Sequence, residues 1–146
     1  MAARTPLIAG NWKLHKNIDA TSALLEALLD PAPPATVDVV VCPPFTSLGQ
    51  AAMLLAGSSV GLGAQNVHWA DEGAFTGEVA APMLAELGVG WVIVGHSERR
   101  TLFGETDHTA LDRAVHAQSR GLRVIYCIGE TLAQREAGET FAVLET

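Results

Sequence analysis

WVIVGHSERR, residues 91–100, is the stretch of this sequence that decides the fold. Its four apolar residues, Trp91 to Val94, are long enough for a strand that is buried on both faces, as strands of parallel sheets are. A glycine, an imidazole, a hydroxyl, a carboxylate and two guanidinium groups follow without a break. Ligands of parallel α/β proteins bind at the carboxyl ends of the strands, so this stretch predicts a site that contains His96.

An apolar run followed by a helical segment recurs along the chain at intervals of roughly thirty residues. The runs that predict strands begin near residues 7, 37, 60, 91 and 123. We therefore expect five βα units of a parallel α/β sheet. Two architectures contain such units, an open doubly wound sheet of five strands and five eighths of a (β/α)8 barrel, and the periodicity does not choose between them.

The helix expected over residues 107–120 has clear local signals at both ends. Thr106 or Asp107 is a suitable cap, and Gly121 is suitable for its end. Four residues of this helix fall roughly in line: Leu111, Ala114, Val115 and Gln118. After the fifth strand, a last helix is expected to begin near Leu132.

The composition narrows the classes of protein that fit. The chain has 146 residues, 49% apolar and 5% aromatic, so we expect one domain over residues 1–146 with an aliphatic core. The net charge of −7 argues against nucleic acid or an anionic membrane as a partner. Two distant cysteines and the short apolar run at the N-terminus favour a cytoplasmic protein. The histidines and cysteines lack metal-ligand spacing, so no metal is expected.

Polar groups also follow the first predicted strand. Strand alternation sends Asn11 and Lys13 to one side and Trp12 to the other. An amide and an ammonium group would then converge on one ligand. The alternative is a solvated lysine at the end of a strand.

The residues around His96 have two interpretations each. His96 is either a structural residue or, if it lies on the backbone amides of a helix N-terminus, a neutral imidazole that donates to a carbonyl. Arg99 and Arg100 either bind an anion or form ion pairs with Glu98 and Glu105, and pairing is the favoured interpretation.

Residues 65–79 have no regular period and are long for a βα connection, which indicates a functional or interfacial segment. An exposed flexible loop is the alternative. It suits Asp71, Glu72 and Gly73 but not the aromatic residues Trp69 and Phe75. The interface is the favoured interpretation.

Four motifs together resemble the triosephosphate isomerase family. They lie in the order and spacing of that family and span the chain: Gly10 to Lys13, Gly73 to Val79, Val92 to Arg100 and Cys127 to Leu132. The resemblance implies a (β/α)8 TIM barrel rather than an open sheet. The sequence departs from the usual pattern in having Leu14 and His15 after the lysine, where Met-Asn is usual, and Phe75 where Tyr is common.

The resemblance also implies a reaction and its residues. The family interconverts dihydroxyacetone phosphate and glyceraldehyde 3-phosphate through an enediol and needs no cofactor. By this likeness, His96 polarises the substrate carbonyl and moves protons between the substrate oxygens. Lys13 supplies positive charge to the ligand, which Asn11 orients. Ser97 and Glu98 support these groups.

Residues 65–79 resemble the dimer loop of the family. Thr76, between Phe75 and Gly77, would be the tip of that loop. In the family this tip enters a pocket of the other subunit close to the lysine and histidine named above. A homodimer of the complete chain is therefore expected.

A barrel of this family has eight strands and about 250 residues, whereas five strands are predicted here. The family's catalytic base is a glutamate after the sixth strand, and no glutamate of this sequence matches its motif, so we assign that role to no residue. We expect an incomplete TIM barrel, without the lid and the phosphate loops, that is inactive by itself. The alternatives are a non-catalytic module that docks another barrel and a phosphate-binding fragment.

Overall fold

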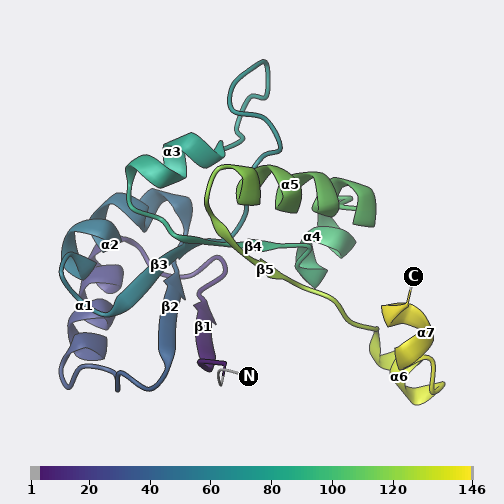
Figure 1. Ribbon diagram of the computed structural model, residues 1–146, viewed down its shortest axis with the longest axis horizontal. Coiled ribbons are helices and arrows are strands. Elements are labelled where there is room, and N and C mark those ends of the chain that lie inside the picture. The colour runs from purple at the N-terminus through teal and green to yellow at the C-terminus, as the bar shows by residue number, and fades with distance from the viewer. Residues whose placement is uncertain (1–3, 146) are drawn as a thin grey trace.

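The computed structural model describes residues 4–145, and within them the strands form one parallel sheet. The strands pair in the order in which they occur in the chain: β1 (Leu7–Asn11), β2 (Asp38–Cys42), β3 (Val60–Ala64), β4 (Trp91–Val94) and β5 (Arg123–Tyr126). A doubly wound sheet reverses its strand order at a switch point, so this sequential order excludes it. The sheet curls into an incomplete (β/α)8 barrel of five βα units (Figure 1).

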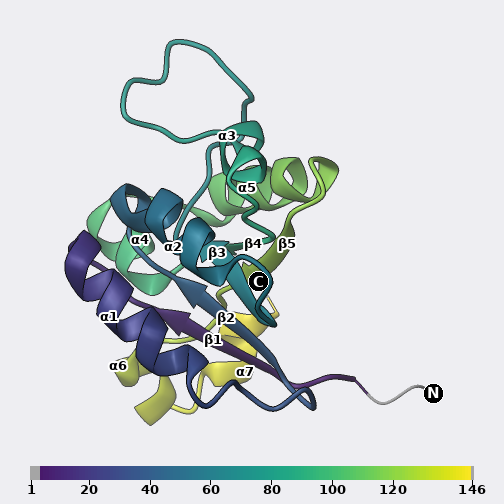
Figure 2. The same cartoon turned by 90° about the vertical axis from the view of Figure 1, so that its left-hand side faces the viewer.

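Helices alternate with the strands, and those before β5 lie on the outer side of the curled sheet, whereas the last two stand apart from it beyond the end of β5 (Figures 1 and 2). Between β1 and β4 they are α1 (Ile18–Leu29), the 3-10 turn η1 (Phe45–Ser47), α2 (Leu48–Leu55) and α3 (Ala81–Glu86). After β4 they are α4 (Ser97–Leu102), α5 (Asp107–Ser119), α6 (Leu132–Glu136) and α7 (Thr140–Leu144). The single last helix expected from Leu132 is therefore wrong, because the chain breaks at Gly138 and forms two short helices.

Apolar side chains fill two layers, one on each face of the sheet. The larger layer packs the outward residues of β2, β3 and β4, such as Val41, Leu62 and Val92, against the helices. The smaller layer lines the inside of the curl and contains Val40, Cys42 and Ile93. This division follows from the alternation of side chains along each strand.

Glycines in β3 make room for the inner layer. A Cβ atom built on Gly63 would lie 2.6 Å from Cys42 Sγ and 3.0 Å from Val40 Cγ1. One built on Gly61 would lie 3.2 Å from Val40 Cγ2 and 3.4 Å from the indole nitrogen of Trp91. The neighbouring strands β2 and β4 thus fill space that side chains of β3 would otherwise occupy.

The buried side of α5 differs from the expected line of residues. Ala110, Arg113, Ala114 and Ala117 are buried, whereas Leu111 and Val115 are 53% and 56% exposed. Small alanines let the helix approach the sheet closely, and the buried Arg113 is compensated by the polar partners described below. Of the four residues that fall in line in the sequence, only Ala114 is buried.

Candidate functional site

An open groove of about 440 Å³ lies at the carboxyl ends of the strands and brings together several of the predicted site residues. Its lining includes Asn11 and Lys13 from the end of β1 and His96 and Glu98 from the end of β4. The volume is in the range of small-ligand sites, which is about 300–1,000 Å³. Segments that are distant in the sequence therefore meet at one edge of the sheet.

His96 lies at the point where β4 passes into α4, and it caps that helix. Its Nδ1 accepts a hydrogen bond from the backbone N–H of Glu98 at 3.2 Å. A ring nitrogen that accepts uses its lone pair, which leaves Nε2 as the donor of the ring, and Glu98 Oε2 lies 3.6 Å from the same Nδ1. An imidazole in this arrangement can donate from Nε2 to a ligand carbonyl.

Lys13 is held in an unusual backbone conformation at the rim of the groove. Its φ is 53°, in the left-handed region that non-glycine residues seldom adopt. The N–H of Lys13 donates to Asn11 Oδ1 at 3.0 Å, and Gln65 Nε2 donates to the Lys13 carbonyl at 3.0 Å. Asn11 and Lys13 line the groove, and Trp12 packs against the outer core, as strand alternation predicts. However, β1 ends at Asn11, so the turn that follows the strand, and not the strand itself, determines the position of Lys13.

Glu98 positions the charged end of Lys13. Lys13 Nζ donates to Glu98 Oε1 at 2.7 Å, across 85 positions of sequence. This hydrogen bond holds the pKa of the Glu98 carboxyl below its ordinary value, and burial opposes the shift. The two groups therefore form an ion pair at neutral pH, directly beside His96.

Ion pairing is confirmed for both arginines after His96, with partly different partners from those expected. Arg99 pairs with Glu105 at 3.0 Å, whereas Arg100 pairs with Asp107. Glu98, the other expected partner, pairs with Lys13 instead.

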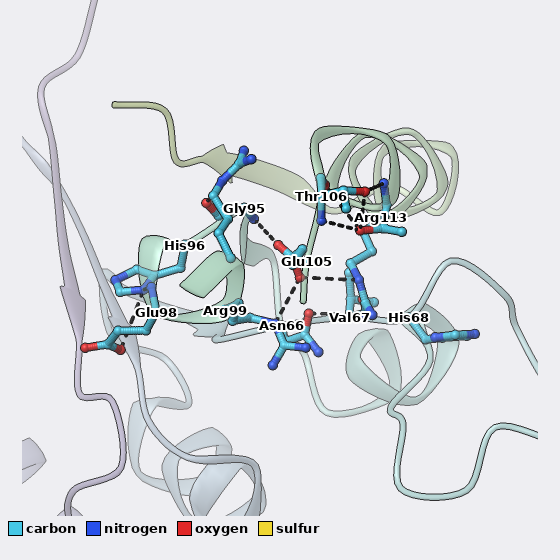
Figure 3. Close-up of polar contacts among 12 residues, drawn as sticks. Asn66, Val67, His68, Gly95, His96, Glu98, Arg99, Glu105, Thr106 and Arg113 are labelled. Atoms are coloured by element: carbon cyan, nitrogen blue, oxygen red, sulfur yellow. Dashed lines mark hydrogen bonds and ion pairs between the residues drawn. The ribbon is translucent and has the colours of Figure 1, made fainter. Parts of the chain in front are cut away.

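Two charged side chains hold Gly95, the residue before His96, through its N–H and its carbonyl, and Figure 3 shows the contact with Glu105. Glu105 Oε1 accepts from the Gly95 N–H at 2.7 Å, and Arg100 Nε donates to the Gly95 carbonyl at 2.7 Å. The Glu105 side chain is only 2% exposed, and its other oxygen lies near Arg99 and Arg113, at 3.0 and 3.5 Å. His96 is thus attached to a rigid, charge-compensated base.

Arg113 joins this base to the irregular segment at residues 65–79 (Figure 3). Its Nη1 donates to Asn66 Oδ1 at 3.2 Å, to the Val67 carbonyl at 2.5 Å and to Glu78 Oε2 at 3.2 Å. Arg113, Asn66 and Gln65 are not among the site residues that the sequence predicts. The one local feature that could have indicated Arg113 is its place on the alanine-rich face of α5, which is the buried face of that helix.

The remaining predicted residues lie away from the groove. Phe75, Thr76 and Gly77 are exposed and belong to the segment that protrudes between β3 and α3 (Figures 1 and 2), and none of the three lines this chain's own groove. Ser97 is exposed at the start of α4 and borders a smaller hollow of about 290 Å³ that also contains His96.

Residues 4–145 contain no group of three or more histidine, cysteine, aspartate or glutamate residues placed to hold a metal ion. Among the same residues, no helix has the length and apolar character needed to cross a bilayer.

Comparison with known proteins places these motifs in one family. The family model described as triosephosphate isomerase matches residues 6–146. A triosephosphate isomerase of Picosynechococcus sp. is 54% identical over 145 residues, which are 97% of this chain and 59% of the relative. The triosephosphate isomerase of Ralstonia nicotianae is 52% identical over 99% of this chain and 58% of the relative. That of Alkaliphilus metalliredigens is 49% identical over 97% of this chain and 57% of the relative.

The chain thus spans somewhat less than three fifths of the curated relatives that it matches. The matched region includes the whole of the groove and the protruding segment described above. The similarity extends over nearly the whole chain, and it agrees with the sequential parallel strands and with the polar groups at their carboxyl ends. The chain belongs to the triosephosphate isomerase family.

Proposed function

We propose that this chain is the N-terminal part of a triosephosphate isomerase. The complete enzyme would interconvert dihydroxyacetone phosphate and D-glyceraldehyde 3-phosphate by proton transfer through an enediol, in cytoplasmic glycolysis and gluconeogenesis, without a cofactor. The observation that carries the proposal is the convergence of Asn11, Lys13 and His96 on one groove. An amide, a cation and a neutral imidazole suit a small anionic substrate with a carbonyl group.

Each group of the groove has a distinct task in this proposal. His96, with its proton on Nε2, polarises the substrate carbonyl and transfers a proton between the two oxygens of the enediol. Lys13 stabilises the negative charge of the substrate and of the enediolate. Asn11 orients the substrate, and its side chain also holds the Lys13 backbone. Glu98 and Ser97 support the lysine and the histidine.

Abstraction of the carbon-bound proton needs a base that these residues do not supply. No glutamate of the 146 residues takes the place of the family's base, and the role stays unassigned. General base catalysis typically contributes about 10²–10⁴-fold. A polypeptide of residues 1–146 alone is therefore expected to show no measurable isomerase activity.

The protruding segment supports a homodimer of the complete enzyme. Phe75 and Thr76 are exposed within it, and the groove near Lys13 carries exposed apolar side chains on its border: Leu14, Phe45 and Phe103. Phe75, which is 42% exposed, gives the segment an apolar surface that can pack against the apolar border of such a groove. The tip of one subunit would enter the groove of the other.

The test uses a completed chain, residues 1–146 joined to the C-terminal remainder of the Picosynechococcus relative. This protein is expected to isomerise glyceraldehyde 3-phosphate in a coupled assay. Lys13→Met should lower kcat/KM by about 10²-fold or more, as the loss of a charge-stabilising group does. Lys16→Met is the matched control, because Lys16 also has a positive φ but does not line the groove, and it should stay within about twofold.

Two results would contradict the proposal. Equal activity of the Lys13 and Lys16 variants would exclude the assigned role of Lys13. Robust turnover by residues 1–146 alone would show that the chain contains a base after all.

A further inference from the structure

Residues 65–79, called here the interface loop, begin with the buried Asn66, Val67 and His68 and then stand out from the barrel (Figures 1 and 2). Side chains of α5 and its C-cap attach the loop at two separate places. The first attachment, at the base, is Arg113 with Asn66, the Val67 carbonyl and Glu78. The second attachment, farther along the loop, uses residues that have no part in the proposed chemistry.

This second attachment is a clasp formed by Asp71, His116 and Arg120. Asp71 Oδ1 lies 2.9 Å from His116 Nε2 and accepts from Arg120 Nε at 3.0 Å, while Asp71 Oδ2 binds Arg120 Nη2. Arginine therefore holds the carboxylate with two nitrogens, which is the strong, directional form of this pair. The His116 side chain is only 18% exposed, so the clasp is partly shielded from solvent.

The spacing of the residues along α5 explains why one helix makes both attachments. Arg113, His116 and Arg120 are separated by three and four positions, which places them along one face. Arg120 is the C-cap of α5, directly after its last residue. The clasp is thus an extension of the row that begins with the buried Arg113.

The interface loop also packs on itself. The ring of His68 lies 4.3 Å from the Trp69 ring and 4.1 Å from the Phe75 ring, and Arg113 lies 4.7 Å from the centre of the Trp69 ring. Thr76 remains exposed beyond this cluster. A single chain therefore holds the loop in shape without a second subunit.

We propose that the clasp preorganises the interface loop for docking against a second copy of this chain and thereby sets the affinity of the homodimer. The proposal rests on the homodimer proposed above. A loop that is ordered only on association loses conformational freedom at that moment, which weakens binding. The clasp removes this loss because Asp71 is already attached to α5 in the free subunit.

The decisive variant is Asp71→Asn in the completed chain, with Glu72→Gln as its control. Both variants remove one negative charge from the loop, but Glu72 is exposed and has no partner among residues 4–145. Sedimentation over a concentration series should show a dimer Kd about fivefold to tenfold higher for Asp71→Asn, the effect of losing a bidentate, partly exposed pair. Glu72→Gln should stay within about twofold of the parent chain.

A second pair of variants separates the clasp from a general loss of folding. Arg120→Leu should raise the Kd as Asp71→Asn does, and Arg120→Lys, which keeps the charge but not the two-nitrogen grip, should fall between it and the parent. Amide hydrogen exchange, measured in dilute monomer, should become faster in the loop of Asp71→Asn and remain slow in the strands.

The outcomes distinguish this proposal from the one on which it rests. A parent chain that stays monomeric at every concentration would overturn the homodimer itself. A dimeric parent with equal Kd values for Asp71→Asn and Glu72→Gln would overturn the clasp. A raised Kd without faster loop exchange would overturn preorganisation as its cause.

Discussion

Replacing Gly95 by alanine tests how rigidly the chain holds His96. Gly95 has a φ of +74°, and a Cβ atom there would lie 3.0 Å from Arg100 Nη2 and 3.1 Å from the Cys127 carbonyl oxygen. The left-handed conformation alone costs a non-glycine residue about 1–2 kcal/mol. Overpacking against two polar neighbours, one of them backbone, adds about 1–3 kcal/mol. Gly95→Ala should therefore lower the free energy of unfolding by roughly 2–5 kcal/mol.

Gly121→Ala is the matched control. Gly121 has a φ of +83°, but nothing lies within 4 Å of a Cβ atom built on it. This variant carries the conformational cost alone, about 1–2 kcal/mol. The difference between the two variants thus reports the contacts around Gly95.

The assay compares urea unfolding and isomerase kinetics of the completed chain and the two variants. Gly95→Ala should also lower kcat by about tenfold or more, because the displaced peptide moves His96 from its productive position. Gly121→Ala should leave kcat within about twofold. Equal losses of stability in the two variants, or an unchanged kcat for Gly95→Ala, would refute the claim that contacts with Arg100 and Cys127 hold the histidine.

Three further predictions concern the groove and the inner layer. The Lys13 hydrogen bond keeps the pKa of Glu98 below its ordinary value, so the pair should stabilise the folded chain at neutral pH, and this contribution should disappear as the pH falls through the lowered pKa. Carbon-13 NMR titration should show the pKa of Glu98 rising toward its ordinary value in Lys13→Met, and an unchanged pKa would exclude the pair. Burial raises the pKa of the Cys42 thiol to about 12. A thiol reagent at pH 8 should therefore modify the half-buried Cys127 first and Cys42 only on unfolding. Labelling of Cys42 in the folded protein would contradict its burial. Gly63→Ala should lower the free energy of unfolding in urea by about 1–3 kcal/mol. Part of this loss should be recovered when Cys42→Ala removes the sulfur atom, which would lie 2.6 Å from the new Cβ. Losses that simply add in the double variant would refute the clash.

Local sequence signals predicted the elements near the site well. The apolar run at Trp91–Val94 is a strand, and the expected cap Thr106 begins α5 with a reciprocal pair of hydrogen bonds to Thr109. Such features depend on residues within one turn or one strand, so a short window of sequence contains the interactions that form them.

Contacts between distant segments were not predictable in the same way. Lys13 pairs with Glu98 from 85 positions away, and Arg113 reaches Asn66 from 47 positions away. Neither pairing leaves a periodic or spaced pattern in the sequence. Likewise, the large side chains of Leu111 and Val115 suggested a packing face, whereas the distance between α5 and the sheet favours alanines.

The sequence by itself determined the order of the βα units, their caps and the polar groups that follow the strands, because these depend on propensities and bonds between near neighbours. Only the tertiary structure decided which way the sheet curls, which ends meet in the groove and which charges neutralise one another. Those choices depend on strand order and on the packing of helices against the sheet, which bring distant residues within hydrogen-bonding distance. His96 is the clearest case: the sequence placed it after a strand, and the folded chain fixed the preceding residue, Gly95, between Glu105 and Arg100.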